Sequence, residues 1–175
     1  MPSGISARAA RPEDAPAIAR ICNEGIEDRL ATFETEPRTA DAVLQVLADS
    51  PSLPAVVVER AGRILGFAWT SPYRPRGAYA GVAEFSVYVE RGARRTGIGR
   101  VALGELIIEA ERRGLWKLVS RIFEDNIASR RLCLALGFRE VGVYRRHGKL
   151  DGRWMDCVIV ERLLGEAAAA PQPVD

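Results

Sequence analysis

A short basic segment that contains two glycines has the residue types needed to bind a phosphate. The segment is Arg94-Arg95-Thr96-Gly97-Ile98-Gly99, between an apolar strand pattern at 82–89 and an apolar helix pattern at 100–113. Main-chain N–H groups in the first turn of a helix have no internal partner, and the helix dipole favours an anion there. Glycines allow the backbone to approach a phosphate without an intervening Cβ. With Arg94, Arg95 and Arg100 adding positive charge, the segment predicts a cradle for a pyrophosphate.

Two better-known phosphate motifs do not describe this segment. The dinucleotide fingerprint requires G-x-G-x-x-G early in a βαβ unit, and a Walker loop requires G-x-x-x-x-G-K-[ST]. Neither pattern is present. On the residues alone, an ordinary glycine-containing turn with solvated arginines remains the alternative.

A single acidic residue interrupts the most apolar strand pattern of the chain. Glu84 is the only ionisable acid or base in Val82–Val89, whose sequence is VAEFSVYV. A carboxylate is costly to bury unless it has a partner or a task, which makes Glu84 a candidate catalytic residue. The alternative is a position that faces outward at an edge.

Two arginines alternate on an extended segment just before that strand. Arg74 and Arg76 flank a proline, and Tyr79 follows them. Arginine gives planar, bidentate recognition of a carboxylate or of an oxyanion such as phosphinate or arsinate, and the tyrosine can donate a further hydrogen bond. Two solvated arginines in a proline-containing loop are the alternative.

The elements that must position these residues form a mixed α/β pattern. We expect strands at 5–10, 54–59, 64–71, 82–89, 117–123, 138–144 and 155–164, and helices at 15–26, 40–48, 100–113 and 127–136. Residues 145–154 are expected to form a late loop. A hairpin-rich sheet with interleaved helices predicts a mixed sheet with flanking helices.

Composition bounds the class of protein. The 175 residues suit one domain, expected at 1–165, followed by a flexible tail at 166–175. The net charge of +2 gives no reason to expect nucleic acid or a membrane surface as a partner. Cys22, Cys133 and Cys157 lack metal-ligand spacing, so we expect no metal and the reduced thiols of a cytoplasmic protein. Neither a membrane span nor a signal peptide is apparent.

The basic segment resembles the acyl-CoA signature R/Q-x-x-G-x-G/A of the GNAT (GCN5-related) acetyltransferases. Lys117–Phe123, Asn126, Ser129–Arg131 and Leu136-Gly137-Phe138 resemble the strand, helix start and "LGF" ending that follow it in that family. The resemblance implies an α/β GNAT fold, with a mixed, mostly antiparallel central sheet, a splayed pair of strands and flanking helices. It also implies acetyl-CoA as cosubstrate.

The resemblance assigns cofactor residues one by one. Amides of Arg95 to Arg100 would hold the pyrophosphate, the strand end Val87-Tyr88-Val89 would pair with the pantetheine arm, and Asn126 would bind CoA further along. A plain N-cap is the alternative for Asn126. The expected cofactor-binding set is Val87, Tyr88, Val89, Arg94, Arg95, Thr96, Gly97, Ile98, Gly99, Arg100, Asn126 and Ser129.

Within the family, the chain resembles the phosphinothricin acetyltransferases and their relatives that acetylate arsinothricin. The segments that carry this resemblance are 25–27, 31–37, 71–79 and 83–89. It implies N-acetylation of a small anionic amino-acid analogue, of the arsinothricin, phosphinothricin or methionine sulfoximine type. Glu84 would take the proton from the amine, directly or through water, and Phe33, Arg74, Arg76 and Tyr79 would bind the acceptor. A protein or peptide N-acetyltransferase is the alternative.

The chain departs from its relatives at one place. Several phosphinothricin enzymes carry a histidine in the late loop, where alignment on Gly152 and Trp154 puts Asp151 here. The sole histidine, His147, lies four positions earlier, and three alternatives are open to it: a place at the site, a dimer contact or a solvated position. Tyr144 and Tyr88 are both candidates for the acid that returns a proton to the CoA thiolate. The family likeness also suggests a homodimer.

Overall fold

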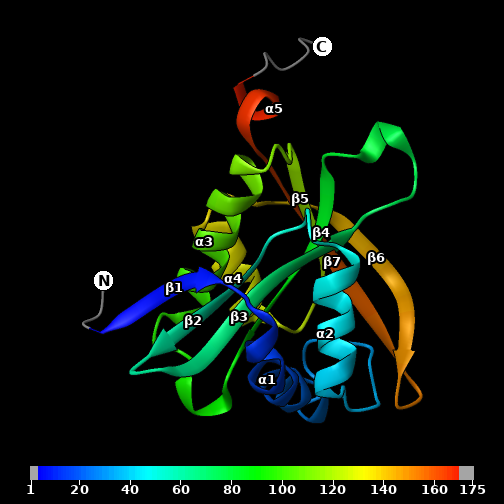
Figure 1. Ribbon diagram of the computed structural model, residues 1–175. Helices are drawn as coiled ribbons and strands as arrows, with labels where there is room; N and C mark the ends of the chain where they lie inside the picture. Colours follow the sequence, from blue (N-terminus) through cyan, green and yellow to red (C-terminus); the bar gives the residue numbers. More distant parts are fainter. Residues whose placement is uncertain (1–3, 170–175) are drawn as a thin grey trace, which may run out of the picture.

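A computed structural model describes residues 4–169 and contains one seven-stranded sheet, in the order β1-β2-β3-β4-β5-β7-β6 (Figure 1). Every neighbouring pair is antiparallel except β4 and β5, which are parallel. The strands are β1 (Ile5–Ala9), β2 (Ala55–Arg60), β3 (Arg63–Pro72), β4 (Val82–Val89), β5 (Lys117–Phe123), β6 (Arg139–Leu150) and β7 (Arg153–Leu163). The α-helices are α1 (Ala15–Glu27), α2 (Ala40–Asp49), α3 (Ile98–Arg112), α4 (Ile127–Ala135) and α5 (Gly165–Ala169). Short 3-10 turns are η1 (Pro12–Asp14), η2 (Gly77–Tyr79) and η3 (Arg91–Ala93).

Helices cover both faces of the sheet, which explains the continuous apolar run of β2. Val57 packs with α1 and α2 on one face, whereas Val56 and Val58 pack with α3 on the other. Successive side chains of a strand point to opposite faces, so a strand covered on both sides needs apolar residues at every position. The predicted fold class is confirmed, with the central strands where the sequence placed them.

The β4–β5 pair opens after three residues. Val82 pairs with Lys117, Ala83 with Leu118 and Glu84 with Val119, and no later pair joins the two strands within the described residues. The rest of β4 keeps its antiparallel pairing with β3, up to Val89 opposite Gly66. The expected splayed pair is therefore present, and one side of β4 is left without a neighbouring strand beyond Glu84.

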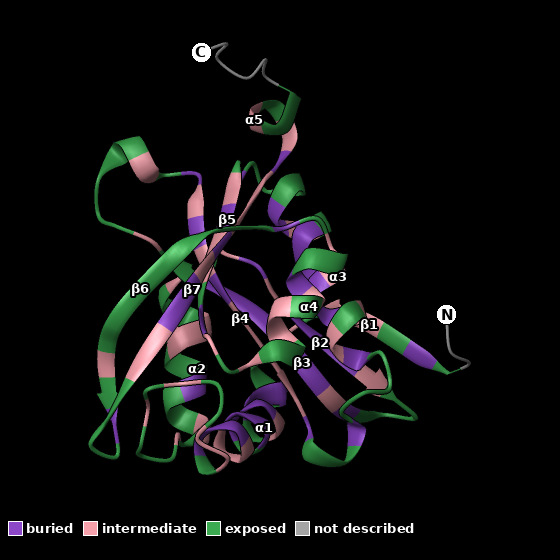
Figure 2. Cartoon of the chain, turned by 180° about the vertical axis from the view of Figure 1, so that it is seen from behind, coloured by how far each residue is buried: buried purple, intermediate pink, exposed green. Residues whose placement is uncertain are grey.

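The last hairpin is longer than the sequence pattern indicated. The expectation of a loop at 145–154 is wrong, because β6 continues to Leu150 and only Asp151 and Gly152 form the turn. Three residues of β6 after Tyr144 lie opposite the single residue Asp156 of β7 and form a bulge. The main-chain amide of Arg146 donates to Asp156 Oδ1 at 2.6 Å, which holds the bulge closed. Most of β6 is exposed (Figure 2), so it lacks the apolar alternation by which a strand is recognised.

The ends of two other elements also differ from expectation. Helix α3 begins at Ile98, inside the basic segment, rather than at Arg100. Residues 166–169 of the expected tail belong to helix α5, while 170–175 lie outside the described residues. No helix among residues 4–169 is both long and apolar enough to cross a membrane.

The three cysteines are unpaired and buried on separate elements. Cys22 lies on α1, Cys133 on α4 and Cys157 on β7. Burial raises the pKa of Cys22 to about 11 and that of Cys133 to about 12, and it also raises the pKa of Cys157. These thiols are therefore protonated, packed side chains.

Candidate active site

The basic segment before α3 presents a row of main-chain donors. Among residues 4–169, the amides of Arg95 to Arg100 have no hydrogen-bond acceptor. Gly97 is the N-cap of α3 with φ of +90°, and a Cβ built there would meet nothing within 4 Å. Donors that point into open space at a helix N-terminus are suited to an anion.

The side chain of Arg94 supports this segment rather than lining it. Arg94 Nη1 lies 2.6 Å from Asp28 Oδ2, and its Nε donates to the Val89 carbonyl at 3.3 Å. Arg91 also donates to Asp28, at 2.8 Å. The hydrogen bond from Arg91, followed by that from Arg94, lowers the pKa of Asp28 despite its partial burial. Asp28 thus fixes both ends of η3, while Arg95 and Arg100 stay exposed.

A small cavity lies in the split between β4 and β5. It is lined by Ser86, Val87 and Tyr88 from β4, by Ser120–Ile122 from β5, and by Asn126 and Ser129 at the start of α4. Asn126 accepts from the Ser129 amide at 3.1 Å and donates to the Leu30 carbonyl at 3.2 Å. The N-cap role of Asn126 is confirmed, and the same side chain anchors the loop between α1 and α2 beside the split.

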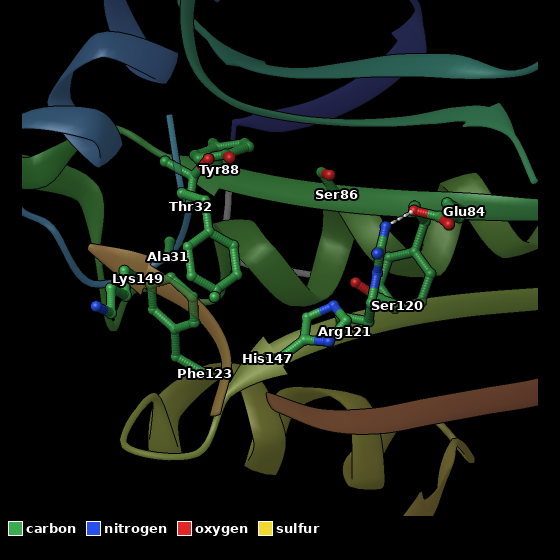
Figure 3. Close-up of a pocket in the computed structure, with 13 residues that line it drawn as sticks. Ala31, Thr32, Glu84, Ser86, Tyr88, Ser120, Arg121, Phe123, His147 and Lys149 are labelled. Atoms are coloured by element: carbon green, nitrogen blue, oxygen red, sulfur yellow. Dashed lines mark hydrogen bonds and ion pairs between the residues drawn. The ribbon is translucent and has the colours of Figure 1, made fainter. Parts of the chain in front are cut away.

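On one face of the sheet the split opens into a hollow of about 530 Å³ (Figure 3). Glu84, Ser86 and Tyr88 alternate along β4, and Arg121 and Phe123 alternate along β5, so all five point to this face. The α1–α2 loop contributes Thr32 and Phe33, and β6 contributes His147 and Lys149. Phe33 packs edge-on against Phe123, with ring centroids 4.8 Å apart.

A second hollow of about 1070 Å³ continues along the same face. Arg74 and Tyr79 line it on the side of the β3–β4 connection, and Val143 and Tyr144 line it on the side of β6. The two hollows share Glu84, Ser120, Arg121 and His147. We call them together the acceptor groove. Arg74 and Tyr79 therefore lie at the groove, whereas Arg76 does not line either hollow.

Glu84 is held by a partner that the sequence analysis did not identify. Arg121 Nη2 lies 2.6 Å from Glu84 Oε2, with the two side chains 47% and 28% exposed (Figure 3). The pair stands where the two hollows meet. The only signal in the sequence was that Arg121, like Glu84, is a charged residue inside an apolar strand pattern, here KLVSRIF. That pattern did not reveal which carboxylate Arg121 contacts.

The groove carries an excess of positive charge. Lys117 pairs with Glu161 at 2.7 Å, and Arg145 pairs with Asp156 at 2.7 Å. Three further basic residues line the groove and have no salt-bridge partner among residues 4–169: Arg74, Arg146 and Lys149. A groove lined in this way favours an anionic ligand.

The bulge in β6 turns His147 into the groove. His147 lines both hollows, stacks on Tyr144 with ring centroids 4.9 Å apart, and lies 6.4 Å from the ring of Phe33. A bulge commonly redirects a side chain in this way. His147 is thus exposed and also lines the groove, and its role in the reaction stays a prediction.

Tyr88 differs sharply from Tyr144 in its surroundings. Its ring stacks on Phe67 at 5.3 Å, and burial raises its pKa to about 12. A Cβ added at Gly25 of α1 would come within 2.8 Å of this ring, so α1 covers it closely. Tyr144 is 48% exposed on β6.

Comparison with known proteins identifies this arrangement. Residues 19–138 match the model of the Acetyltransferase (GNAT) family. The chain belongs to the GNAT acetyltransferases. A phosphinothricin N-acetyltransferase from Alcaligenes faecalis is 37% identical, over 90% of this chain and 81% of its own length.

Solved structures agree with this membership. A GNAT phosphinothricin acetyltransferase from Sinorhizobium meliloti, in complex with acetyl-CoA, matches with a TM-score of 0.87 and 30% identity, covering 97% of this chain and 94% of that chain. A ribosomal-protein-alanine N-acetyltransferase from Brucella melitensis matches with a TM-score of 0.87 and 35% identity, covering 91% and 99%. The protein is an acetyl-CoA-dependent N-acetyltransferase.

The residues of this acetyltransferase fit acetyl-CoA. The unpartnered amides of Arg95 to Arg100 suit a pyrophosphate, and the absence of a Cβ at Gly97 leaves space in front of them. The open side of β4 beyond Glu84 can pair with an extended amide-containing arm as an added strand would. Within residues 4–169 no group of side chains is arranged to hold a metal ion.

Proposed function

We propose that this acetyltransferase acetylates the amine of a small amino-acid analogue that carries a second anionic group, of the phosphinothricin or arsinothricin type. The observation that carries the proposal is the basic acceptor groove, in which Arg74, Arg146 and Lys149 lack carboxylate partners within the described chain. Methionine sulfoximine belongs to the same acceptor type by shape. The relatives from Alcaligenes faecalis and Sinorhizobium meliloti, both named phosphinothricin acetyltransferases, support a small acceptor.

The geometry supports a set of cofactor-binding residues. Backbone amides of Arg95, Thr96, Gly97, Ile98, Gly99 and Arg100 would hold the CoA pyrophosphate. The main chain of Val87, Tyr88 and Val89 would pair with the pantetheine arm, and Asn126 and Ser129 would contact it from α4. Arg94 would act by holding the segment in place through Asp28. Acetyl-CoA supplies the acetyl group as a thioester.

Glu84 is proposed as the general base. It is the last residue of β4 that pairs with β5, beside the split and on the groove face. An amine is protonated at neutral pH and must lose a proton before it can attack an acyl carbon. A carboxylate at this position can accept that proton directly or through water. Tyr88, Tyr144 and His147 are candidates to return a proton to the thiolate, because all three line the groove.

Three broader proposals accompany this activity: detoxification of the acceptor as the physiological role, the cytoplasm as the location and a homodimer as the assembly. The buried, unpaired thiols support a reducing compartment. Strand β6 is at one end of the described sheet, and its outer edge is open to a partner. Light scattering of the purified protein measures the assembly directly.

The decisive experiment compares acceptors that differ by one charge. Phosphinothricin and methionine sulfone have nearly the same shape, but only the former carries an anionic tetrahedral group. We expect kcat/KM to be at least about tenfold higher for phosphinothricin, since each charge-assisted contact contributes about 1.5–3 kcal/mol. Arsinothricin and a peptide with an N-terminal alanine complete the panel. Preferential acetylation of the peptide would overturn the proposal in favour of a protein acetyltransferase.

A further inference from the structure

The Glu84–Arg121 pair stands at the junction of the two hollows, and no other ion pair does so within residues 4–169. Glu84 is the last residue of β4 that pairs with β5, and its partner there is Val119. Arg121 lies two residues beyond Val119, where the two strands have already separated. Both side chains point to the groove face (Figure 3). They are charged, partly exposed and adjacent to each other at the mouth of the split.

This arrangement mirrors the charges of an α-amino acid. In such a molecule an ammonium and a carboxylate are attached to a single carbon, so the two charges are as close as Glu84 and Arg121 are. We propose that the acceptor exchanges ion pairs with the enzyme: its α-carboxylate takes Arg121, and its ammonium takes Glu84. This inference rests on the proposed function and specifies its acceptor as an α-amino acid.

The exchange conserves charge and improves the geometry of each contact. One ion pair within the protein is replaced by two between protein and acceptor, so neither Glu84 nor Arg121 is left without a partner. The guanidinium plane of Arg121 matches a carboxylate in a bidentate manner, whereas with Glu84 the structure records a contact through one nitrogen. Arg74, Arg146 and Lys149, further along the groove, remain for a second anion.

The exchange also prepares the proton transfer. With Arg121 drawn to the acceptor, the freed oxygen of Glu84 faces the ammonium. The N–H bond breaks with its electron pair left on nitrogen, and an O–H bond forms at Glu84 Oε2. The base is thus exposed only to an acceptor that carries a carboxylate next to its amine. Arg121 is therefore a residue that determines specificity.

Other charged or titratable groups line the groove around this pair. They are Tyr88 from β4, Lys117 from β5, His147, Tyr144, Arg145, Arg146 and Lys149 from β6, Glu161 from β7, and Arg74, Tyr73 and Tyr79 from the β3–β4 connection. Lys117 and Glu161 neutralise each other, and Arg145 is engaged by Asp156. Arg121 is the one cation that already contacts Glu84 and is held by no second carboxylate within the described chain.

The test compares two acceptors in the wild type and in Arg121→Gln. Phosphinothricin is paired with its decarboxylated analogue, (3-aminopropyl)(methyl)phosphinate, which keeps the amine and the anionic phosphinate. We expect wild-type kcat/KM to favour phosphinothricin by about 10- to 150-fold, the value of one charge-assisted bidentate contact. In Arg121→Gln this preference should largely disappear, because only the amino acid loses a contact. Arg121→Lys should keep part of the preference.

The matched control is Arg153→Gln. Arg153 also lies on a strand of the sheet and pairs with a carboxylate, Asp125 at 2.9 Å, but it is 72% exposed and lines neither hollow. This variant should retain the wild-type preference. Calorimetric titration with acetyl-CoA and a melting curve establish that each variant is folded and binds its cosubstrate.

Each outcome bears on one claim. Equal wild-type kcat/KM for the two acceptors would overturn the role of Arg121, and this measurement needs no variant. A preference that persists in a folded Arg121→Gln enzyme would overturn it as well. If the wild type acetylates neither compound but acetylates the alanine peptide, the proposed function fails, and this inference fails with it.

Discussion

Phe33 occupies the space that a side chain at position 148 would need. A Cβ built on Gly148 would lie 2.7 Å from Phe33 Cε1 and 2.9 Å from its Cζ. The ring also packs on Phe123, so the α1–α2 loop is fixed onto β5 and β6 at the groove. Gly148 thus sets how closely this loop covers the acceptor site.

Gly148→Ala is expected to displace the ring of Phe33 and loosen this cover. Overpacking costs about 1–3 kcal/mol, and the low end applies because Phe33 is partly exposed. The KM for the acceptor should rise while acetyl-CoA affinity stays unchanged. In a Phe33→Ala background the same substitution should have no further effect, since the two residues act on one contact. Urea unfolding and steady-state kinetics of the four proteins check this, and additive effects would contradict it.

Gly97→Ala should weaken acetyl-CoA binding. The position has φ of +90° and faces open space, so alanine brings both backbone strain and a methyl group in front of the donor amides. Gly62→Ala is the control, because it has φ of +76° in the β2–β3 turn, also with open space around it. Each should lose about 1–2 kcal/mol of stability. Only Gly97→Ala should lower the affinity for acetyl-CoA in a calorimetric titration. Equal acetyl-CoA affinities of the two variants would show that the basic segment before α3 is not the pyrophosphate site.

Arg74→Ala and Arg76→Ala should differ in their effect on the KM for the acceptor, although the sequence predicted both arginines to bind it. Losing one charge-assisted contact raises KM for an anionic acceptor by an amount equivalent to about 1.5–3 kcal/mol. Since Arg74 lines the groove and Arg76 does not, we expect the larger effect from Arg74→Ala. Wild-type KM in both variants, for every active acceptor, would show that neither arginine binds substrate.

Glu84→Gln should lower kcat at pH 7 by about 10²- to 10⁴-fold, the usual contribution of a general base. The amide keeps the shape and can still accept a hydrogen bond, so acetyl-CoA affinity should barely change. Part of the activity should return at high pH, where the solvent supplies free amine. Near-normal kcat at pH 7 would assign the base elsewhere, and His147, on the same groove, is the next residue to substitute.

Acid should weaken the support of the basic segment through Asp28. Its pKa lies below the ordinary 3.8 because Arg91 and Arg94 hydrogen-bond to the carboxylate. The stability that these contacts add is present above pH 3.8 and is lost as pH falls through the lower pKa of the folded state. Asp28→Asn should reduce this loss when melting temperature is followed against pH. It should also weaken acetyl-CoA binding at neutral pH, which an Asp125→Asn control should not do.

The fold was predictable where local pattern and burial coincide. Residues 82–89 and 117–123 are buried on at least one face, and both strands have the predicted limits. The full length of strand β6 was not predictable, because an exposed edge strand with a bulge needs no apolar alternation. For the same reason the sequence could not indicate that His147 points into the groove.

The site was predictable in its kinds of residue but not in its pairings. Glu84 stood out as an acid among apolar neighbours. Its partner Arg121 is 37 residues away on a parallel strand, and only the fold brings the two together. Asp28 was likewise unremarkable in sequence, although it holds the basic segment from the end of α1.

The burial of the three cysteines gives the protein its own probes of local opening. Each thiol is 2% exposed or less, so a thiol reagent can reach it only after a local opening. Modification of Cys22 requires α1 to move away from the sheet, that of Cys133 requires α4 to move, and that of Cys157 requires β5 and β7 to separate. The modification rate at each cysteine, measured by mass spectrometry of the peptides, therefore reports how often that region opens locally. A ligand that seats on α4 and β4 should slow the rate at Cys133 and leave the others nearly as they were. Because of the same burial, the cysteines of the folded enzyme add no background signal to assays that detect the thiol of released CoA.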